Sequence, residues 1–384
     1  MDDAQGGVVA RRSTQLLVAA CVLMATIGAG RRAGGEEFSR TERDRLLQRA
    51  QVWLPPVADT ADLARTPAAD DGFAPDAMVE CRFQPSGVGG STPKFECLLA
   101  DGDVVKVKYG RNNPEVFSEV IASRLLARLG FPADRMYPVG EVRCLGCPDD
   151  PFKALQCLND GTPAETCFRR LDYSRAAVFR DAVIERPLKG RRVEAGRDRG
   201  WTWEELASID PAAGGAPRAH LDALRLMAVY LGHWDNKAEN QRLVCLDAGE
   251  DGPCERPVAM VQDLGDAFGP FKLDLDGWRK LPVWTDVASC RVSMRSLPYE
   301  GSTFPDITIS EEGRAFLAGR LRALTEADLR ALVAGARLDR YQPARGRRAT
   351  LDDWADVMHQ KLRAIVDRPP CRSTGFSATP AGRR

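Results

Sequence analysis

The sequence predicts an α+β protein with two lobes, a small antiparallel β lobe followed by a larger, mainly helical lobe. Three observations predict this fold class. Segments that alternate apolar and polar residues, as strands do, are concentrated before residue 187. One strong helical segment, residues 114–130, interrupts them. Apolar residues at helical spacing then dominate the chain from residue 217 onward.

The first strands form an expected meander of three, over residues 78–84, 94–100 and 103–110. Asp101-Gly102 between the second and third strands is a tight hairpin signal. The helix over 114–130 begins with a proline and ends at Gly130, a common helix stop. Further expected strands cover residues 135–144 and 177–186, separated by a cysteine-rich insertion.

The second half is expected to contain a buried helix over 217–232, a hairpin formed by 241–246 and 257–265, and helices within 310–336 and 351–367. The predicted organisation is therefore a signal or anchor at 1–30, a helix and linker at 31–76, a first lobe at 77–186, a second lobe at 187–340, and a helix with a disordered tail at 341–384.

Composition is that of an ordinary folded protein, with 44% hydrophobic and 28% charged residues among 384. Lysine plus arginine and aspartate plus glutamate both number 54, so no global field attracts nucleic acid. Nucleic acid is not an expected partner, and any anion site must be local.

The N-terminus resembles an export signal. Arg11 and Arg12 precede an apolar run of about 14 residues, from Leu16 to Ala29, that ends in small residues. This run is shorter than the roughly 20 residues that a membrane-spanning helix needs. We expect a periplasmic or extracellular protein, with an uncleaved N-terminal membrane anchor as the alternative.

The cysteines agree with export. Of 11 cysteines, Cys21 lies in the signal, and the even number that remains suits disulfide pairing outside the cytosol. Cys81 and Cys97 flank the first hairpin, and Cys245 and Cys254 lie on opposite arms of a later one, so each pair could form a bridge. Two disulfides are also expected in the insertion, where zinc binding is the alternative; its cysteines are Cys144, Cys147, Cys157 and Cys167.

The segment "HWDNKAEN", residues 233–240, resembles the catalytic loop of protein kinases. The resemblance implies that Asp235 orients or deprotonates an acceptor hydroxyl and that Lys237 steadies the transferring phosphoryl group. Asn240 would be a magnesium ligand, because hard cations prefer oxygen donors. A polar turn after a helix is the structural alternative.

A second motif follows in the order that phosphoryl transfer requires. "VQDLG", residues 261–265, resembles the metal-binding Asp-Phe-Gly of kinases, with Leu264 in place of phenylalanine. Asp263 would be the second magnesium ligand.

Residues that would bind the nucleotide precede these motifs. Lys108 on the strand "VVKVK" matches the phosphate-binding lysine, with Lys106 as its rival on the same face. Glu119 on the next helix would pair with that lysine, with Glu115 as the alternative. The backbone of Ile184 to Arg186, between the lobes, would meet adenine.

A glycine-rich loop, "SGVGGST", lies before the lysine strand, where backbone amides could converge on phosphate oxygens. The residues assigned to this contact are Gly87, Gly89, Gly90 and Ser91. A flexible hairpin turn is the alternative.

Residues 78–340 are therefore similar to an atypical kinase of the HipA-type or phosphatidylinositol 3-/4-kinase-like group. The divergent glycine loop and the absence of Ala-Pro-Glu after Asp263 separate them from ordinary protein kinases. The resemblance implies ATP and Mg²⁺ and transfer of the γ-phosphoryl group to a hydroxyl of a protein, lipid or small molecule. A catalytically weak nucleotide- or partner-binding module, AMP transfer on the same fold, and a disulfide-rich structural protein are the alternatives.

Overall fold

The structure is a computed structural model that describes residues 38–56, 62–67, 69–86, 89–168, 171–247, 252–298, 303–344 and 347–371. The predicted signal or anchor and the predicted disordered tail after residue 371 lie outside these ranges. No helix within them is long and apolar enough to cross a membrane. The described residues fall in one compact unit, and the division into two lobes stays a prediction.

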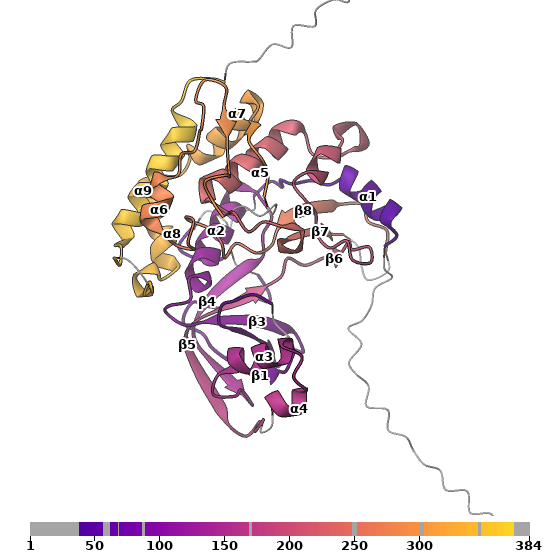
Figure 1. Cartoon of the computed structure of the whole chain (residues 1–384), viewed down its shortest axis with the longest axis vertical. Helices are drawn as coiled ribbons and strands as arrows, with labels where there is room; N and C mark the ends of the chain where they lie inside the picture. The colour runs from indigo at the N-terminus through magenta and orange to yellow at the C-terminus, as the bar shows by residue number, and fades with distance from the viewer. Residues whose placement is uncertain are drawn as a thin grey trace, which may run out of the picture. The chain divides into compact units, whose positions relative to one another are not determined.

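Five strands form a closed barrel in the order β1-β2-β3-β5-β4. They are β1 (Met78–Gln84), β2 (Lys94–Leu98), β3 (Val104–Tyr109), β4 (Arg135–Leu145) and β5 (Ala176–Arg186). The expected antiparallel meander of β1, β2 and β3 is present. Figure 1 shows the barrel strands together, with the two short insertion helices, α3 (Pro151–Asn159) and α4 (Ala164–Cys167), beside them.

The barrel corrects the expectation of a purely antiparallel β lobe, because β1 and β4 pair in parallel. Parallel neighbours need a long crossover connection, and here it is the chain from β2 through α2 to β4. Alternation along the sequence predicts hairpins between consecutive strands, but it carries no signal for a partner that returns after a helix.

Helix α2 (Glu115–Leu129) begins and ends close to the predicted positions. Gly130 ends it with φ 89°, and the ring of Trp53 leaves no room for a side chain there. The helix contacts barrel strands β3, β4 and β5 and also α8 (Glu326–Gly335). It is consequently buried on nearly all sides, including its charged residues Glu115 and Glu119.

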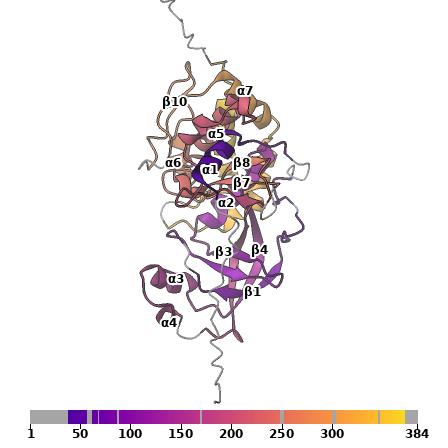
Figure 2. The ribbon, with the colours of Figure 1, turned by 90° about the vertical axis from the view of Figure 1, so that its right-hand side faces the viewer.

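The rest of the described chain is built on helices and a three-stranded sheet in the order β6-β7-β8. Its strands are β6 (Arg191–Arg192), β7 (Gln241–Cys245) and β8 (Pro257–Val261), and β7 and β8 form the predicted hairpin. The helix expected within residues 31–76 is α1, which covers Arg40–Gln48 and contacts β8 (Figure 2).

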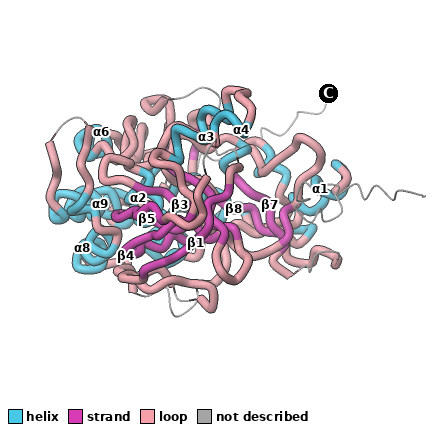
Figure 3. Tube along the Cα trace, turned by 90° about the horizontal axis from the view of Figure 1, so that it is seen from below, coloured by secondary structure: helices cyan, strands magenta, loops and turns pink. Residues whose placement is uncertain are grey.

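Helix α7 (Glu311–Leu321) packs between α5 (Arg218–Leu231) and α9 (Leu351–Val366). Helix α8 packs on α9. The large hydrophobic core lies among these helices, α2 and the β7–β8 hairpin, and a separate core fills the barrel. Figure 3 shows the strands in magenta with helices grouped to their sides. The remaining elements are short: α6 (Leu275–Lys280), the pair β9 (Arg291–Val292) and β10 (Ile307–Thr308), and 3₁₀ turns at Glu205–Ser208, Pro211–Ala213, Ala238–Asn240 and Leu338–Arg340.

The described part of the segment expected as a linker packs against the fold. Leu63 is buried in the large core. Asp71 forms an ion pair with Arg135 at 2.9 Å, and Arg135 and Lys189 together lower the pKa of Asp71 to about 2 against the effect of burial.

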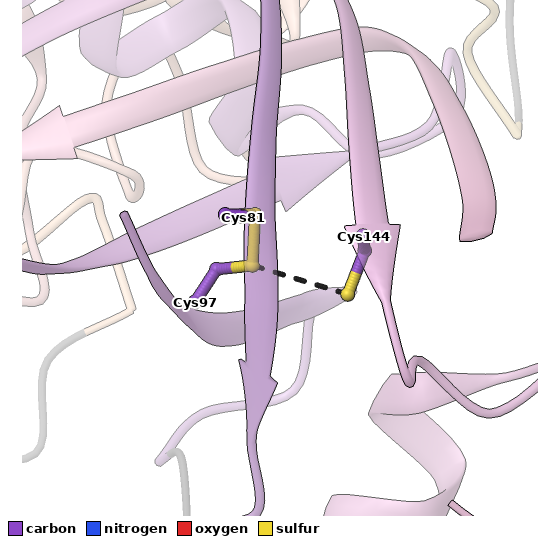
Figure 4. A group of neighbouring side chains, drawn as sticks. All are labelled: Cys81, Cys97 and Cys144. Carbon is purple, nitrogen blue, oxygen red and sulfur yellow. Dashed lines mark hydrogen bonds between the residues drawn. A yellow bond between two sulfur atoms is a disulfide. The ribbon is translucent and has the colours of Figure 1, made fainter. Parts of the chain in front are cut away.

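Five disulfides join described cysteines: Cys81–Cys97, Cys144–Cys147, Cys157–Cys167, Cys245–Cys254 and Cys290–Cys371. The predicted bridges across both hairpins and the two within the insertion are confirmed. In Figure 4 the sulfurs of Cys97 and Cys144 lie 3.9 Å apart. Because both are oxidised, this is a packing contact between two disulfides and neither a hydrogen bond nor a zinc site. Several disulfides in one chain are typical of an oxidising environment.

Candidate functional site

Lys108 lies on β3 with only 1% of its surface exposed. Its ammonium contacts the carboxylate of Glu119, and it lies 3.4 Å from an oxygen of Glu115 and 3.5 Å from one of Glu185. Burial lowers the pKa of Lys108, but Glu119, Glu115 and Glu185 outweigh burial and raise the pKa well above its ordinary value. Lys108 is therefore a buried cation held against α2, while burial raises the pKa of its partner Glu119 well above its ordinary value.

Lys106, the predicted rival, has a different set of contacts. Its ammonium pairs with Glu185 at 2.9 Å, and its side chain is 29% exposed. Lys108 is thus the strand lysine that contacts both candidate glutamates of α2, and Lys106 pairs with β5.

Two further lysines, which the sequence did not single out, reach the same glutamate. Lys94 on β2 lies 3.1 Å from Glu115, and Lys272, after the Asp-Leu-Gly motif, lies 3.0 Å from it. We call this group the ion cluster; its members are Lys94, Lys106, Lys108, Lys272, Glu115, Glu119 and Glu185. The sequence could have indicated Lys94, because the hairpin that is centred on Asp101 places Lys94 directly opposite Lys108 on the neighbouring strand.

The described part of the glycine loop lies over Lys94. Gly90 adopts φ 88°, and a side chain there would come within 2.9 Å of the Lys94 ammonium. Gly89, Gly90 and Ser91 are exposed, and Gly87 lies outside the described residues.

The His233–Asn240 turn directly follows α5. Both oxygens of Asp235 accept from the Lys237 ammonium, at 2.9 and 3.1 Å. The Asn240 side-chain amide donates to the backbone carbonyl of Asp235 at 2.6 Å, which fixes the orientation of that amide. Asp235 and Asn240 are half-buried and Lys237 is exposed.

Hydrogen bonds between buried groups anchor the His233–Asn240 turn to the rest of the fold. The Trp203 indole donates to the side chain of Asn236 at 2.6 Å and so supports the turn. His233 is buried, and its Nδ1 lies 3.2 Å from the carbonyl oxygen of Asp266. Burial lowers the pKa of His233. The neutral ring therefore donates to that carbonyl and is not a proton carrier in this geometry.

Asp263 follows β8 and lies next to Asn240. The backbone amides of Gln262 and Asp263 donate to the Asn240 carbonyl at 3.0 and 3.2 Å, and Gly265 donates to an Asp263 carboxylate oxygen at 3.0 Å. Burial raises the pKa of Asp263, but the attraction of nearby cations, above all Lys108, outweighs burial and lowers the pKa to about 2. Asp263 is ionised at neutral pH and lies within the electrostatic reach of Lys108.

Charged residues of the His233–Asn240 turn and of the Asp-Leu-Gly motif affect one another electrostatically. Asp235 and Asp263 both raise the pKa of Lys237. Asp266, a third acid, lies 3.3 Å from Lys272, and burial, with contributions from Asp235 and Asp263, raises its pKa to about 6. Asp263 is therefore coupled electrostatically to Lys108 on one side and to Lys237 on the other.

The residues predicted to meet adenine lie at the end of β5. Ile184 is fully buried in the barrel, and its backbone is in register with Val107 on one side and Tyr137 on the other. This is the predicted site residue that the structure fits least, because two-sided strand pairing already occupies its backbone groups. Arg186, the last residue of β5, pairs with Asp103 at 2.5 Å.

A cavity of about 500 Å³ lies beside the ion cluster and shares Lys272 with it. Its wall includes the residues before α2, the segment 271–276 and the chain leading into α9. Lys108, Asp235 and Asp263 do not line it, so this cavity is separate from the two motifs.

No known family model matches the chain, and no curated protein matches it. Among solved structures, the chain is similar to the crystal structure of the Helicobacter pylori proinflammatory kinase CtkA. The TM-score is 0.40 and the identity is 11%, over 76% of this chain and 96% of that chain.

Proposed function

We propose that this protein is an exported kinase-like phosphotransferase that transfers the γ-phosphoryl group of ATP to a hydroxyl acceptor. The observation that carries the proposal is the ionised Asp263, adjacent to Asn240 and electrostatically coupled to a buried lysine that pairs with Glu119. Phosphoryl transfer depends mainly on charge placement, and a lysine, a metal-binding acid and amide, and an acceptor-orienting acid are its usual parts.

The donor set fits magnesium. Asp263 supplies an ionised carboxylate, and the Asn240 amide is fixed through its nitrogen, which leaves its oxygen as the donor atom. Hard cations such as Mg²⁺ prefer these oxygen ligands. Bound there, magnesium would neutralise charge on the phosphates.

The chain's own residues would divide the remaining work. Lys108 would bind the α- and β-phosphates through charge-assisted hydrogen bonds. Asp235 would accept a hydrogen bond from the acceptor hydroxyl and orient it, and Lys237 would steady the transferring group. The half-exposed position of Asp235, against the burial of Lys108, is consistent with an acceptor that arrives from solvent.

The test compares Asp263→Ala, Asp235→Ala and a control, Asp276→Ala, which removes an exposed acid of α6 paired with Arg279. ATP binding with and without Mg²⁺ is measured by calorimetry. Transfer is measured from γ-labelled ATP to the protein itself and to casein. We expect Asp263→Ala to lose magnesium-dependent ATP binding. Asp235→Ala should keep binding and lose transfer by about 10²- to 10⁴-fold, and the control should match the wild-type chain.

Full transfer activity in both site variants would refute the proposal. Binding of MgATP by the wild-type chain without any transfer would instead favour a nucleotide-binding module. The mass of the modified product distinguishes phosphoryl transfer from AMP transfer.

A further inference from the structure

Three lysine ammoniums surround one carboxylate in the ion cluster. Lys94 and Lys108 lie 3.1 and 3.4 Å from Oε2 of Glu115, and Lys272 lies 3.0 Å from Oε1. Lys94 and Lys108 are 5% and 1% exposed, and Glu115 is 3% exposed. Buried ammonium groups are costly unless anions compensate them, so the three cations have been brought together around an anion position.

These three lysines come from different elements. Lys94 on β2 and Lys108 on β3 face each other directly across an antiparallel pair, which places both side chains on the same face. Lys272 reaches them from the segment after Asp-Leu-Gly, where its backbone and that of Leu273 have positive φ of 29° and 53°. Left-handed backbone in non-glycine residues is strained and is typical of functional sites.

Two observations connect Lys94 with the proposed nucleotide site. The glycine loop lies over its ammonium, since a side chain at Gly90 would approach it to 2.9 Å. Lys94 also shares Oε2 of Glu115 with Lys108, the proposed phosphate-binding lysine. Lys94 therefore lies against the glycine loop and in the same ion-pair network as Lys108.

We propose that Lys94 and Lys272 bind the terminal phosphates of the nucleotide together with Lys108, and that the Glu115 carboxylate holds the three ammoniums in the absence of nucleotide. The inference rests on the proposed function. In this arrangement Glu115 competes with the phosphates, whereas Glu119 keeps Lys108 oriented.

The proposal predicts effects of opposite sign for neighbouring residues. Lys94→Gln and Lys272→Gln should each weaken binding of MgATP by about 10- to 100-fold, because one charge-assisted hydrogen bond contributes roughly 1.5–3 kcal/mol. Glu115→Gln should tighten MgATP binding severalfold, since it removes the competing charge. If the cluster only stabilised the fold, removing either partner of the Lys94–Glu115 pair would weaken binding.

The experiment measures dissociation constants of the full chain for MgATP, magnesium with inorganic triphosphate, and adenosine. Adenosine affinity should be unchanged in all variants, and triphosphate should follow ATP. Lys280→Gln, which removes an exposed lysine of α6, is the matched control. Urea unfolding confirms that each variant is folded.

The outcomes separate this inference from the proposed function. If the wild-type chain binds ATP and the Lys94→Gln and Lys272→Gln variants bind it with the same affinity, the inference is wrong but the proposed function stands. Weaker ATP binding by Glu115→Gln would have the same meaning. A wild-type chain that binds triphosphate but not ATP would support the lysine site and refute the proposed function. Binding of neither probe would refute both.

Discussion

The ion cluster and the His233–Asn240 turn supply the two halves of the candidate site, and they are built in opposite ways. The cluster is buried, and its charges compensate one another across β2, β3, α2, β5 and the segment around Lys272. The turn is half-exposed: the side chains of Asp235, Lys237 and Asn240 bond within a few residues, and its buried side chains bond to the distant Trp203 and Asp266. The cluster therefore depends on buried ion pairs, whereas the charged pair of the turn, Asp235 with Lys237, is close in sequence and partly exposed, and variants in the two regions should separate stability from activity.

The largest effect on stability is expected for Lys108→Met. Removing the ammonium leaves Glu115, Glu119 and Glu185 buried with less compensation, and breaking a buried ion pair costs about 3–5 kcal/mol. Urea unfolding measures the free energy change. The double variant Lys108→Met with Glu119→Gln should recover part of the loss. A loss under about 1 kcal/mol for the single variant would show that the cluster is no more coupled to the fold than a surface pair.

Asp266 joins the two regions and should give an intermediate, pH-dependent effect. Its carbonyl oxygen accepts from the Trp234 amide and lies beside His233, while its carboxylate faces Lys272. Burial raises the pKa of Asp266 from 3.8 to about 6, so the folded chain keeps a proton that the unfolded chain releases between these values. Stability contributed by this group is therefore present below pH 3.8 and is lost as the pH rises to 6.

The measurement is the free energy of unfolding at pH 4 and pH 6.5 for the wild-type chain and Asp266→Asn. The wild type should lose about 2 kcal/mol more than the variant across this range, at about 1.4 kcal/mol per pKa unit. Equal slopes for both proteins would contradict a raised pKa for Asp266 in the folded chain.

The smallest effect on stability is expected in the turn. Asp235→Asn removes a charge that is paired with an exposed lysine, and such pairs contribute roughly 0–1 kcal/mol. Urea unfolding should therefore change by less than about 1 kcal/mol. A loss above 2 kcal/mol would mean that the turn, like the cluster, is held by its charges, and the comparison between the two regions would fail.

Local signals predicted a large share of the fold. The alternation in β1, β2 and β3, the Asp101-Gly102 hairpin and the end of α2 at Gly130 follow from residues close in sequence, and the structure contains all of them. The cysteines that flank each hairpin pair for the same reason, since strand pairing brings them together. The parallel β1–β4 pair was missed because its partners are separated by two strands and a helix.

The sequence by itself determined the local parts of this protein: its main strands and helices, the polar turn after α5, and a strand lysine followed by a glutamate on the next helix. Backbone periodicity and short-range hydrogen bonding act within a few residues, so the amino-acid sequence alone predicts them. Only the tertiary structure decided that Lys94 and Lys272 join Lys108 around Glu115 and that Ile184 is sealed within the barrel. Both follow from strand register and burial, because electrostatic compensation in a low-dielectric interior depends on distances through space.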